Sequence, residues 1–235
     1  MLVENKTKRS IWARVKRVLL WLFALQLVYV VALRWIDPPF TITQLSNCIL
    51  GNGCERDYVN AGQISPYARL AVIASEDQLF TAHHGFDWDR IQAALKHNEK
   101  KPNKLRGGST ISQQTAKNVF LWQGRSWVRK GLEVYFTFMI ELVWGKKRIL
   151  EVYLNVIEMG KGVFGIEAAA QKYFGKSARQ LSRREAALIA ASLPNPKRYK
   201  VKPASGYIQY RASFIQRQMM HLQSDPAIRA LIENR

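Results

Sequence analysis

The sequence is poor in cysteine and in acidic residues, and it has no internal repeat or low-complexity run. Its two cysteines, Cys48 and Cys54, have no second pair and no nearby His, which argues against a structural zinc site. If the main body is extracytoplasmic, they could form a disulfide around Gly51-Asn52-Gly53; two free thiols are the alternative.

The shortage of acidic residues leaves a large positive charge. The 17 Asp and Glu face 36 Lys and Arg, for a formal net charge of +19 over 235 residues. Such an excess implies an anionic partner, whether nucleic acid, a membrane surface or a phosphorylated substrate, and charge alone does not choose among them. A hydrophobic content of 48% with seven Trp indicates a folded core. The length suits one sizeable domain with an appendage.

The one long hydrophobic run covers residues 18–36 and contains only one Gln and one Arg. Nineteen residues of helix span roughly 28 Å, close to the bilayer core of about 30 Å. Residues 1–17 are basic, so the positive-inside rule predicts a cytoplasmic tail, a transmembrane helix and an external body. A cleaved signal peptide and a buried soluble helix are the alternatives; the run lacks a small-x-small cleavage site and a polar face.

Asp37-Pro38-Pro39 ends this run, and residues 37–59 are predicted to be a linker, with a brief strand at 41–43. The remaining residues, 60–235, are assigned to one domain. Ser65-Pro66 predicts the start of a helix that places Glu76 near its C-terminal end. Asp77, Phe80, His83 and Gly85 follow within nine residues of Glu76, a density that favours a positioned acid or base over a bland helix end.

Gly107-Gly108-Ser109-Thr110 opens another predicted helix that carries Gln114 and Lys117 on one face. Two glycines before a helix start form a nest of backbone N–H groups suited to a phosphate or sugar, although an ordinary glycine turn fits too. The run 119–122 after it is apolar and either dips towards lipid or is buried.

Residues 126–145 predict an amphipathic helix whose apolar stripe includes Val128, Leu132, Tyr135, Phe136, Met139 and Val143. Lys130 and Glu133 lie off this stripe and would form an exposed ion pair. Gly131 is costly inside a helix, which suggests a close approach by another helix or a ligand. The later match to G-x-G-x-x-G at 160–165 is interpreted as loop glycines between helices, since no βαβ pattern surrounds it.

Five blocks, taken together and in order, resemble the peptidoglycan glycosyltransferases of glycosyltransferase family 51, over residues 60–200. They are Glu76-Asp77-x-x-Phe80-x-x-His83-x-Gly85, Gly107-Gly108-Ser109-Thr110-Ile111-Ser112-Gln113-Gln114, Arg129-Lys130-x-x-Glu133, Lys146-x-x-Ile149-Leu150-Glu151-x-Tyr153-Leu154-Asn155 and Arg184-Glu185-Ala186-Ala187. No S-x-x-K or K-T-G block occurs, so a penicillin-binding transpeptidase domain is not expected.

The resemblance implies a mainly α, lysozyme-like glycosyltransferase domain with a small membrane-proximal lobe. It implies polymerisation of lipid II into β-1,4 glycan strands, with inversion and release of undecaprenyl pyrophosphate, at the bacterial inner membrane. Implied partners are lipid II, the growing glycan, membrane lipid and proteins of cell-wall synthesis or division, with no nucleic acid. No cofactor or metal site is implied, although a divalent cation could accompany the substrate's pyrophosphate.

Carried over residue by residue, the resemblance makes Glu76 the catalytic base and Glu133 an assisting carboxylate. The implied substrate-binding residues are Ser109, Gln114, Lys117, Arg125 and Lys130. The implied supports are Asp77, Phe80, His83, Gly85, Gly107, Gly108, Arg129, Tyr153 and Asn155. A lytic enzyme that cleaves glycan and a non-enzymatic basic membrane protein remain the competing hypotheses.

Overall fold

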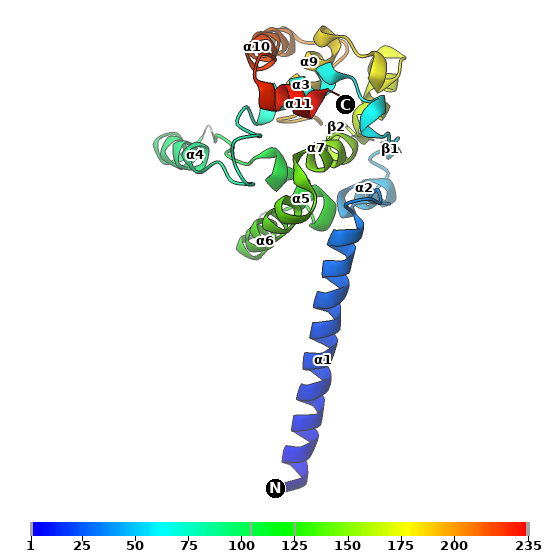
Figure 1. Ribbon diagram of the computed structural model, residues 1–235, viewed down its shortest axis with the longest axis vertical. Coiled ribbons are helices and arrows are strands. Elements are labelled where there is room, and N and C mark those ends of the chain that lie inside the picture. The colour runs from blue at the N-terminus through cyan, green and yellow to red at the C-terminus, as the bar shows by residue number, and fades with distance from the viewer. Residues whose placement is uncertain (1, 104, 125, 234–235) are drawn as a thin grey trace. The chain divides into compact units, whose positions relative to one another are not determined.

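The computed structural model describes residues 2–103, 105–124 and 126–233, with side chains from residue 11 onwards. Within these residues the chain is mainly helical, as predicted, and it divides into two compact units, Met1–Asp37 and Pro38–Arg235 (Figure 1). The helices are α1 (Leu2–Ala32), α2 (Ile42–Ile49), α3 (Pro66–Glu76), α4 (Trp88–Lys100), α5 (Ile111–Phe120), α6 (Trp127–Val143), α7 (Gly145–Val156), α8 (Ile166–Phe174), α9 (Arg183–Ser192), α10 (Gly206–Leu222) and α11 (Pro226–Ile232). Two 3₁₀ turns cover Ala61–Gln63 and Ala178–Gln180.

The first unit is the helix α1. Its stretch Ile11–Ala32 is long and apolar enough, by length and composition, to cross a membrane. The helix continues through the basic tail to Leu2 and ends at Ala32, so its bounds differ from the predicted 18–36. A turn at residues 33–35 precedes Asp37-Pro38, where proline restricts the preceding residue to extended backbone.

Residues 38–59, predicted to belong to a linker, are structured and belong to the second unit. The brief strand expected at 41–43 is wrong, because α2 begins there. Thr41 is its N-cap, and Gln44 completes a capping box with it: each side chain bonds the other residue's backbone N–H. A disulfide joins Cys48 to Cys54 and so links the end of α2 to the loop that follows it.

A three-stranded sheet connects this segment to the middle of the chain. Strand β3 (Val163–Phe164) lies between β1 (Glu55–Arg56), which is parallel to it, and β2 (Glu158–Gly160), which is antiparallel. Gly160 and Gly162 therefore belong to a small hairpin, and the interpretation of them as loop glycines between helices is corrected. A Cβ on Gly162 would lie 2.6 Å from the Cα of Gly53, so the hairpin turn has no room for a side chain there.

Two buried helices form the centre of the second unit. α3 starts at the predicted N-cap Ser65, is buried from Ala68 to Ala74, and packs against α9, α10 and α11 (Figure 1). α5 packs against α6 and α7. The backbone N–H of Ile111, the first residue of α5, donates to Asp77 just beyond α3, so the end of one helix is fixed to the start of the other.

The orientation of α6 is the largest departure from the sequence prediction. Its buried residues are Glu133, Thr137 and Ile140. Of the predicted apolar stripe, Val128 and Leu132 are exposed, whereas the other four residues are half-buried: Tyr135, Phe136, Met139 and Val143. The large apolar residues exposed along it are Trp127, Val128, Leu132, Val134, Phe138 and Leu142. The close approach of another helix expected at Gly131 is also wrong, since a Cβ there would meet nothing within 4 Å.

Candidate active site

Glu76 is the last residue of α3, and its half-buried carboxylate receives one donor on each oxygen. Gln114 Nε2 on α5 donates to Oε2 at 2.9 Å, and the hydroxyl of Ser75 lies 3.2 Å from Oε1. The guanidinium of Arg90 on α4 donates to the backbone carbonyl of Glu76. The carboxylate is therefore oriented from two sides, and its backbone is fixed separately.

The orientation of the Gln114 amide is itself determined. The hydroxyl of Tyr153 on α7 donates to Gln114 Oε1 at 3.2 Å, which leaves the amide nitrogen facing Glu76. Tyr153 is completely buried, and burial, followed by the charges of Glu76 and Asp77, raises its pKa well above the usual value. The phenol thus stays protonated and remains a donor to Gln114.

Asp77 holds the turn that follows α3. Its buried carboxylate accepts from His83 Nε2 at 3.0 Å and from the Ile111 N–H at 3.0 Å. Asp77 and His83, predicted to support the site, therefore connect three backbone segments beneath it.

Gly85 ends this turn in a place that only glycine can occupy. Its φ is +90°, and a Cβ would lie 2.9 Å from Thr137 Cγ2 and 3.1 Å from Glu141 Cγ on α6. The Thr110 hydroxyl donates to the Gly85 carbonyl at 2.6 Å. Phe80, predicted beside it, is fully buried.

Glu141 and Lys146 take part in this packing, and neither was among the predicted site residues. Glu141 Oε1 accepts from the Ser112 hydroxyl and, at 2.7 Å, from Lys146 Nζ. Lys146 also lies over the ring of Phe80, 4.5 Å from its centroid. Glu141 lies about two helical turns after Glu133, and that spacing was the available signal.

Glu133 is buried on the inner face of α6 and carries two cations. Its side chain is 3% exposed and accepts from Arg129 Nη1 at 2.9 Å and Lys130 Nζ at 2.5 Å. The expected exposed ion pair is corrected accordingly. Because burying a lone carboxylate is costly, both partners are needed to hold it on this face.

Lys117 lies within electrostatic reach of both predicted catalytic carboxylates. Burial lowers its pKa; the charge of Glu133 raises it, Arg129 and Lys130 lower it, and Glu76 raises it. Lys117 lies one turn after Gln114 on α5. The structure thus places a mostly buried amine, two carboxylates and two further cations within range of one another.

Ser109 and Lys130, both predicted to bind substrate, line one cavity of about 190 Å³ between α4, the 106–109 segment and α6. Gly108 packs against α4, where a Cβ would lie 3.1 Å from the Ala94 Cβ, whereas one on Gly107 would meet open space. The predicted anion nest is partly occupied. Of the first N–H groups of α5, that of Ile111 donates to Asp77 and another donates to the Thr110 hydroxyl.

Arg125, also predicted to bind substrate, lies outside the described residues. Asn155 lies two residues after Tyr153 in the last turn of α7, and its amide bonds both the N–H and the carbonyl of Val59. It ties the 57–60 segment to α7. No cluster of three or more His, Cys, Asp or Glu that could hold a metal ion occurs among the described residues.

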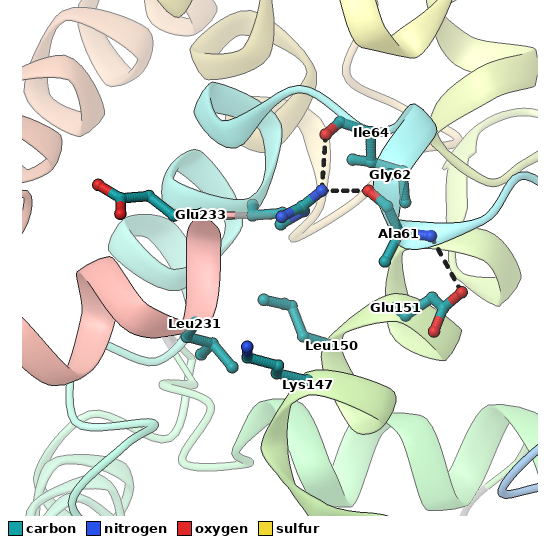
Figure 2. Close-up of a pocket in the computed structure, with 9 residues that line it drawn as sticks. Ala61, Gly62, Ile64, Lys147, Leu150, Glu151, Leu231 and Glu233 are labelled. Carbon is teal, nitrogen blue, oxygen red and sulfur yellow. Dashed lines mark hydrogen bonds between the residues drawn. The ribbon is translucent and has the colours of Figure 1, made fainter. Parts of the chain in front are cut away.

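A separate cavity of about 320 Å³ lies between the 61–64 turn, α7 and α11 (Figure 2). Arg69 lines it and donates to the carbonyls of Ala61, Ile64 and Ile232. Burial lowers the pKa of Arg69 and the charge of Glu151 raises it. None of the predicted site residues lines this cavity. Its arginine connects the 61–64 turn to the end of α11 through hydrogen bonds to backbone carbonyls.

Comparison with known proteins places this architecture in one family. A family model described as Transglycosylase matches residues 43–220, most of the second unit. The chain therefore belongs to the transglycosylase family.

Similar proteins match this chain over nearly its whole length. A biosynthetic peptidoglycan transglycosylase of Escherichia coli is 52% identical over 238 residues, and one of Shigella sonnei is 52% identical over 233 residues. Each alignment covers 94% of this chain and 96% of the relative. The similarity therefore extends beyond the shared domain to nearly the whole length.

Proposed function

We propose that this chain is a peptidoglycan glycosyltransferase that polymerises lipid II into β-1,4 glycan strands. The observation that carries the proposal is the near full-length, 52% identity to biosynthetic peptidoglycan transglycosylases. The arrangement around Glu76 supports the same reaction, because it holds a carboxylate in a fixed orientation at the end of a buried helix.

In this reaction Glu76 acts as the general base. It takes the proton from the 4-hydroxyl of the acceptor sugar while that oxygen attacks the anomeric carbon of the donor, which inverts the configuration. Gln114 and Ser75 occupy one lone pair on each carboxylate oxygen, and each oxygen has a second lone pair for the proton. The donor's undecaprenyl pyrophosphate leaves.

Cations suit a pyrophosphate leaving group, which needs charge stabilisation more than protonation. Lys117 and Lys130 would supply that charge, together with Arg125, and Ser109 would contact the donor beside Lys130. Glu133 already accepts from two cations, so it assists by holding Arg129 and Lys130 in place. A glycan hydrolase would instead need a protonated carboxylic acid at the leaving oxygen. A divalent cation could accompany the pyrophosphate.

The apolar helix α1, the basic N-terminus and the exposed apolar face of α6 all fit attachment to a membrane. The apolar helix Ile11–Ala32 would anchor the chain in the inner membrane, with the basic N-terminus in the cytoplasm and the domain in the periplasm. The exposed apolar face of α6 would contact membrane lipid beside the lipid-linked substrate. Trp122 is exposed after α5 while Leu121 is buried, so only part of the 119–122 run is available to lipid. Further partners would be proteins of cell-wall synthesis or division.

Purified full-length protein in detergent, supplied with lipid II, tests the proposal. The wild type should give glycan polymer and released undecaprenyl pyrophosphate. Glu76→Gln should lower the rate about 10²–10⁴-fold. Glu99→Gln, which removes an exposed carboxylate from α4, is the matched control and should retain the wild-type rate.

Two outcomes would contradict the proposal. Shortening of preformed glycan without polymer formation would indicate a lytic enzyme. Binding of lipid II or anionic vesicles without any turnover, unchanged by Glu76→Gln, would indicate a basic binding protein.

A further inference from the structure

The hydroxyl of Ser75 lies where three helices meet beside the proposed base. Its Oγ is 3.2 Å from Glu76 Oε1 and 3.3 Å from the carbonyl oxygen of Ala190 on α9. The Nη2 of Arg211 on α10 donates to the same oxygen at 3.4 Å. Ser75 is thus linked to the base, to a neutral carbonyl and to a guanidinium.

The chemistry of a hydroxyl limits how these contacts can be used. Arg211 can only donate, so it occupies a lone pair of Oγ and leaves the single hydroxyl proton for one other partner. A charged Glu76 is the stronger acceptor, because hydrogen bonds to ionised groups are stronger than neutral ones. Once Glu76 is protonated this advantage is lost, and the Ala190 carbonyl competes for the proton.

The placement of Arg211 suggests that it serves this contact. Its Nε is buried without a hydrogen-bond partner among the described residues, an arrangement that costs free energy. Gln114 donates to the other oxygen of Glu76, and its amide is held in one orientation by Tyr153. The hydroxyl of Ser75 is therefore the donor to Glu76 that can change its partner.

We propose that Ser75 and Arg211 are a positioning pair for Glu76. The Ser75 hydroxyl donates to Glu76 while the carboxylate is charged and turns to Ala190 after Glu76 has taken the acceptor's proton. Arg211 keeps the hydroxyl oxygen in place during the change. This inference rests on the proposed function and adds two residues to it, neither of which lies in the five sequence blocks.

Steady-state polymerisation of lipid II by full-length variants tests the pair. Ser75→Ala should lower kcat about 10-fold, which corresponds to about 1.4 kcal/mol of barrier, with little change in KM. Ser75→Thr, which keeps a hydroxyl, should recover most of the rate. Because Ser75→Ala removes a donor that favours the charged carboxylate, the acidic limb of its pH–rate profile should move to higher pH.

Arg211→Met should reproduce both effects, and it should add nothing in the double variant Ser75→Ala/Arg211→Met, since Arg211 acts through Ser75. The matched controls lie on the same helix: Arg217→Met removes an exposed guanidinium that stacks on Phe214, and Ser213→Ala removes a hydroxyl bonded to Gln209. Both should behave as the wild type. Thermal unfolding of each variant separates lost positioning from lost folding.

The outcomes of these experiments distinguish a failure of the positioning pair from a failure of the proposed function. An unchanged kcat and an unshifted acidic limb in Ser75→Ala would overturn the inference, as would effects of Ser75→Ala and Arg211→Met that multiply in the double variant. Wild-type protein that makes no polymer would instead refute the proposed function, and the positioning pair would fall with it. An active wild type with an unaffected Ser75→Ala removes the pair alone.

Discussion

Replacing Glu133 by Gln would remove one negative charge from a buried group of cations. The side chain of Glu133 is 3% exposed and accepts from Arg129 at 2.9 Å and Lys130 at 2.5 Å. Gln keeps one acceptor and can satisfy one of the two. Hydrogen bonds to charged groups contribute about 1.5–3 kcal/mol each, and breaking a buried ion pair costs about 3–5 kcal/mol. Because Lys130 is 41% exposed, water screens its share, and the expected loss is about 2–4 kcal/mol.

The same substitution should change the pH dependence through Lys117. Burial lowers the pKa of this amine and the charge of Glu133 raises it, so removing that charge lowers the pKa further. Lys117 can stabilise a pyrophosphate only below its pKa, where it is charged, and loses that capacity as the pH rises through it. The alkaline limb of the polymerisation rate should therefore move to lower pH in Glu133→Gln.

The protonation of Lys117 has the opposite effect on folding stability. Since the folded pKa of Lys117 lies below its unfolded value, folding favours the neutral amine, and protonation opposes folding below the folded pKa. This penalty disappears as the pH rises towards the unfolded value of about 10.4. The stability deficit of Glu133→Gln should therefore shrink at alkaline pH.

Urea unfolding in detergent, followed by tryptophan fluorescence, measures the stability, and lipid II polymerisation across pH measures the limb. Glu55→Gln is the control, because it also removes a carboxylate paired with a lysine, Lys172, but its side chain is 55% exposed. It should lose less than about 1 kcal/mol. A Glu133→Gln protein that matches this control in stability, with an unshifted alkaline limb, would refute the role of Glu133 as the shared counter-charge.

Three further substitutions follow from the packing. Gly85→Ala should destabilise by about 2–4 kcal/mol in urea unfolding, because a Cβ at φ +90° meets Thr137 and Glu141; a loss below about 0.5 kcal/mol would contradict that packing. Gly131→Ala, with open space around its Cβ, should stabilise α6 by up to about 1 kcal/mol at unchanged activity, and lost activity would indicate a ligand there. Tyr153→Phe should free the amide that it orients and lower kcat about 3–10-fold, with the unfolding free energy reduced by about 0.5–1.5 kcal/mol; an unchanged kcat would show that the amide needs no such guide.

Local chemistry allowed parts of the fold to be predicted from the sequence. The N-cap at Ser65 was identified correctly, because its side chain accepts from the backbone N–H of Tyr67, only two residues away. The same signal at Thr41 and Gln44 was overlooked in favour of a strand.

The contacts that were not predicted are long-range. Tyr153 reaches Gln114 across 39 positions, and Arg211 reaches Ser75 across 136. The spacing of residue types along the sequence does not predict such distant pairs. The prediction for α6 was incomplete for a different reason: a pattern identifies an apolar face but not what covers it, and here the fully buried residues are Glu133, Thr137 and Ile140.

The two faces of α6 contribute to two different properties of the domain. The buried face contributes to folding, and the exposed apolar face lowers solubility in water. The buried side chains of α6 are Glu133, Thr137 and Ile140, whereas Trp127, Phe138 and Leu142 are exposed and contribute little to the interior. These exposed apolar side chains add to the tendency of the domain to associate in detergent-free buffer. Polar replacements at these three positions should reduce that association and leave the surroundings of Glu133 intact.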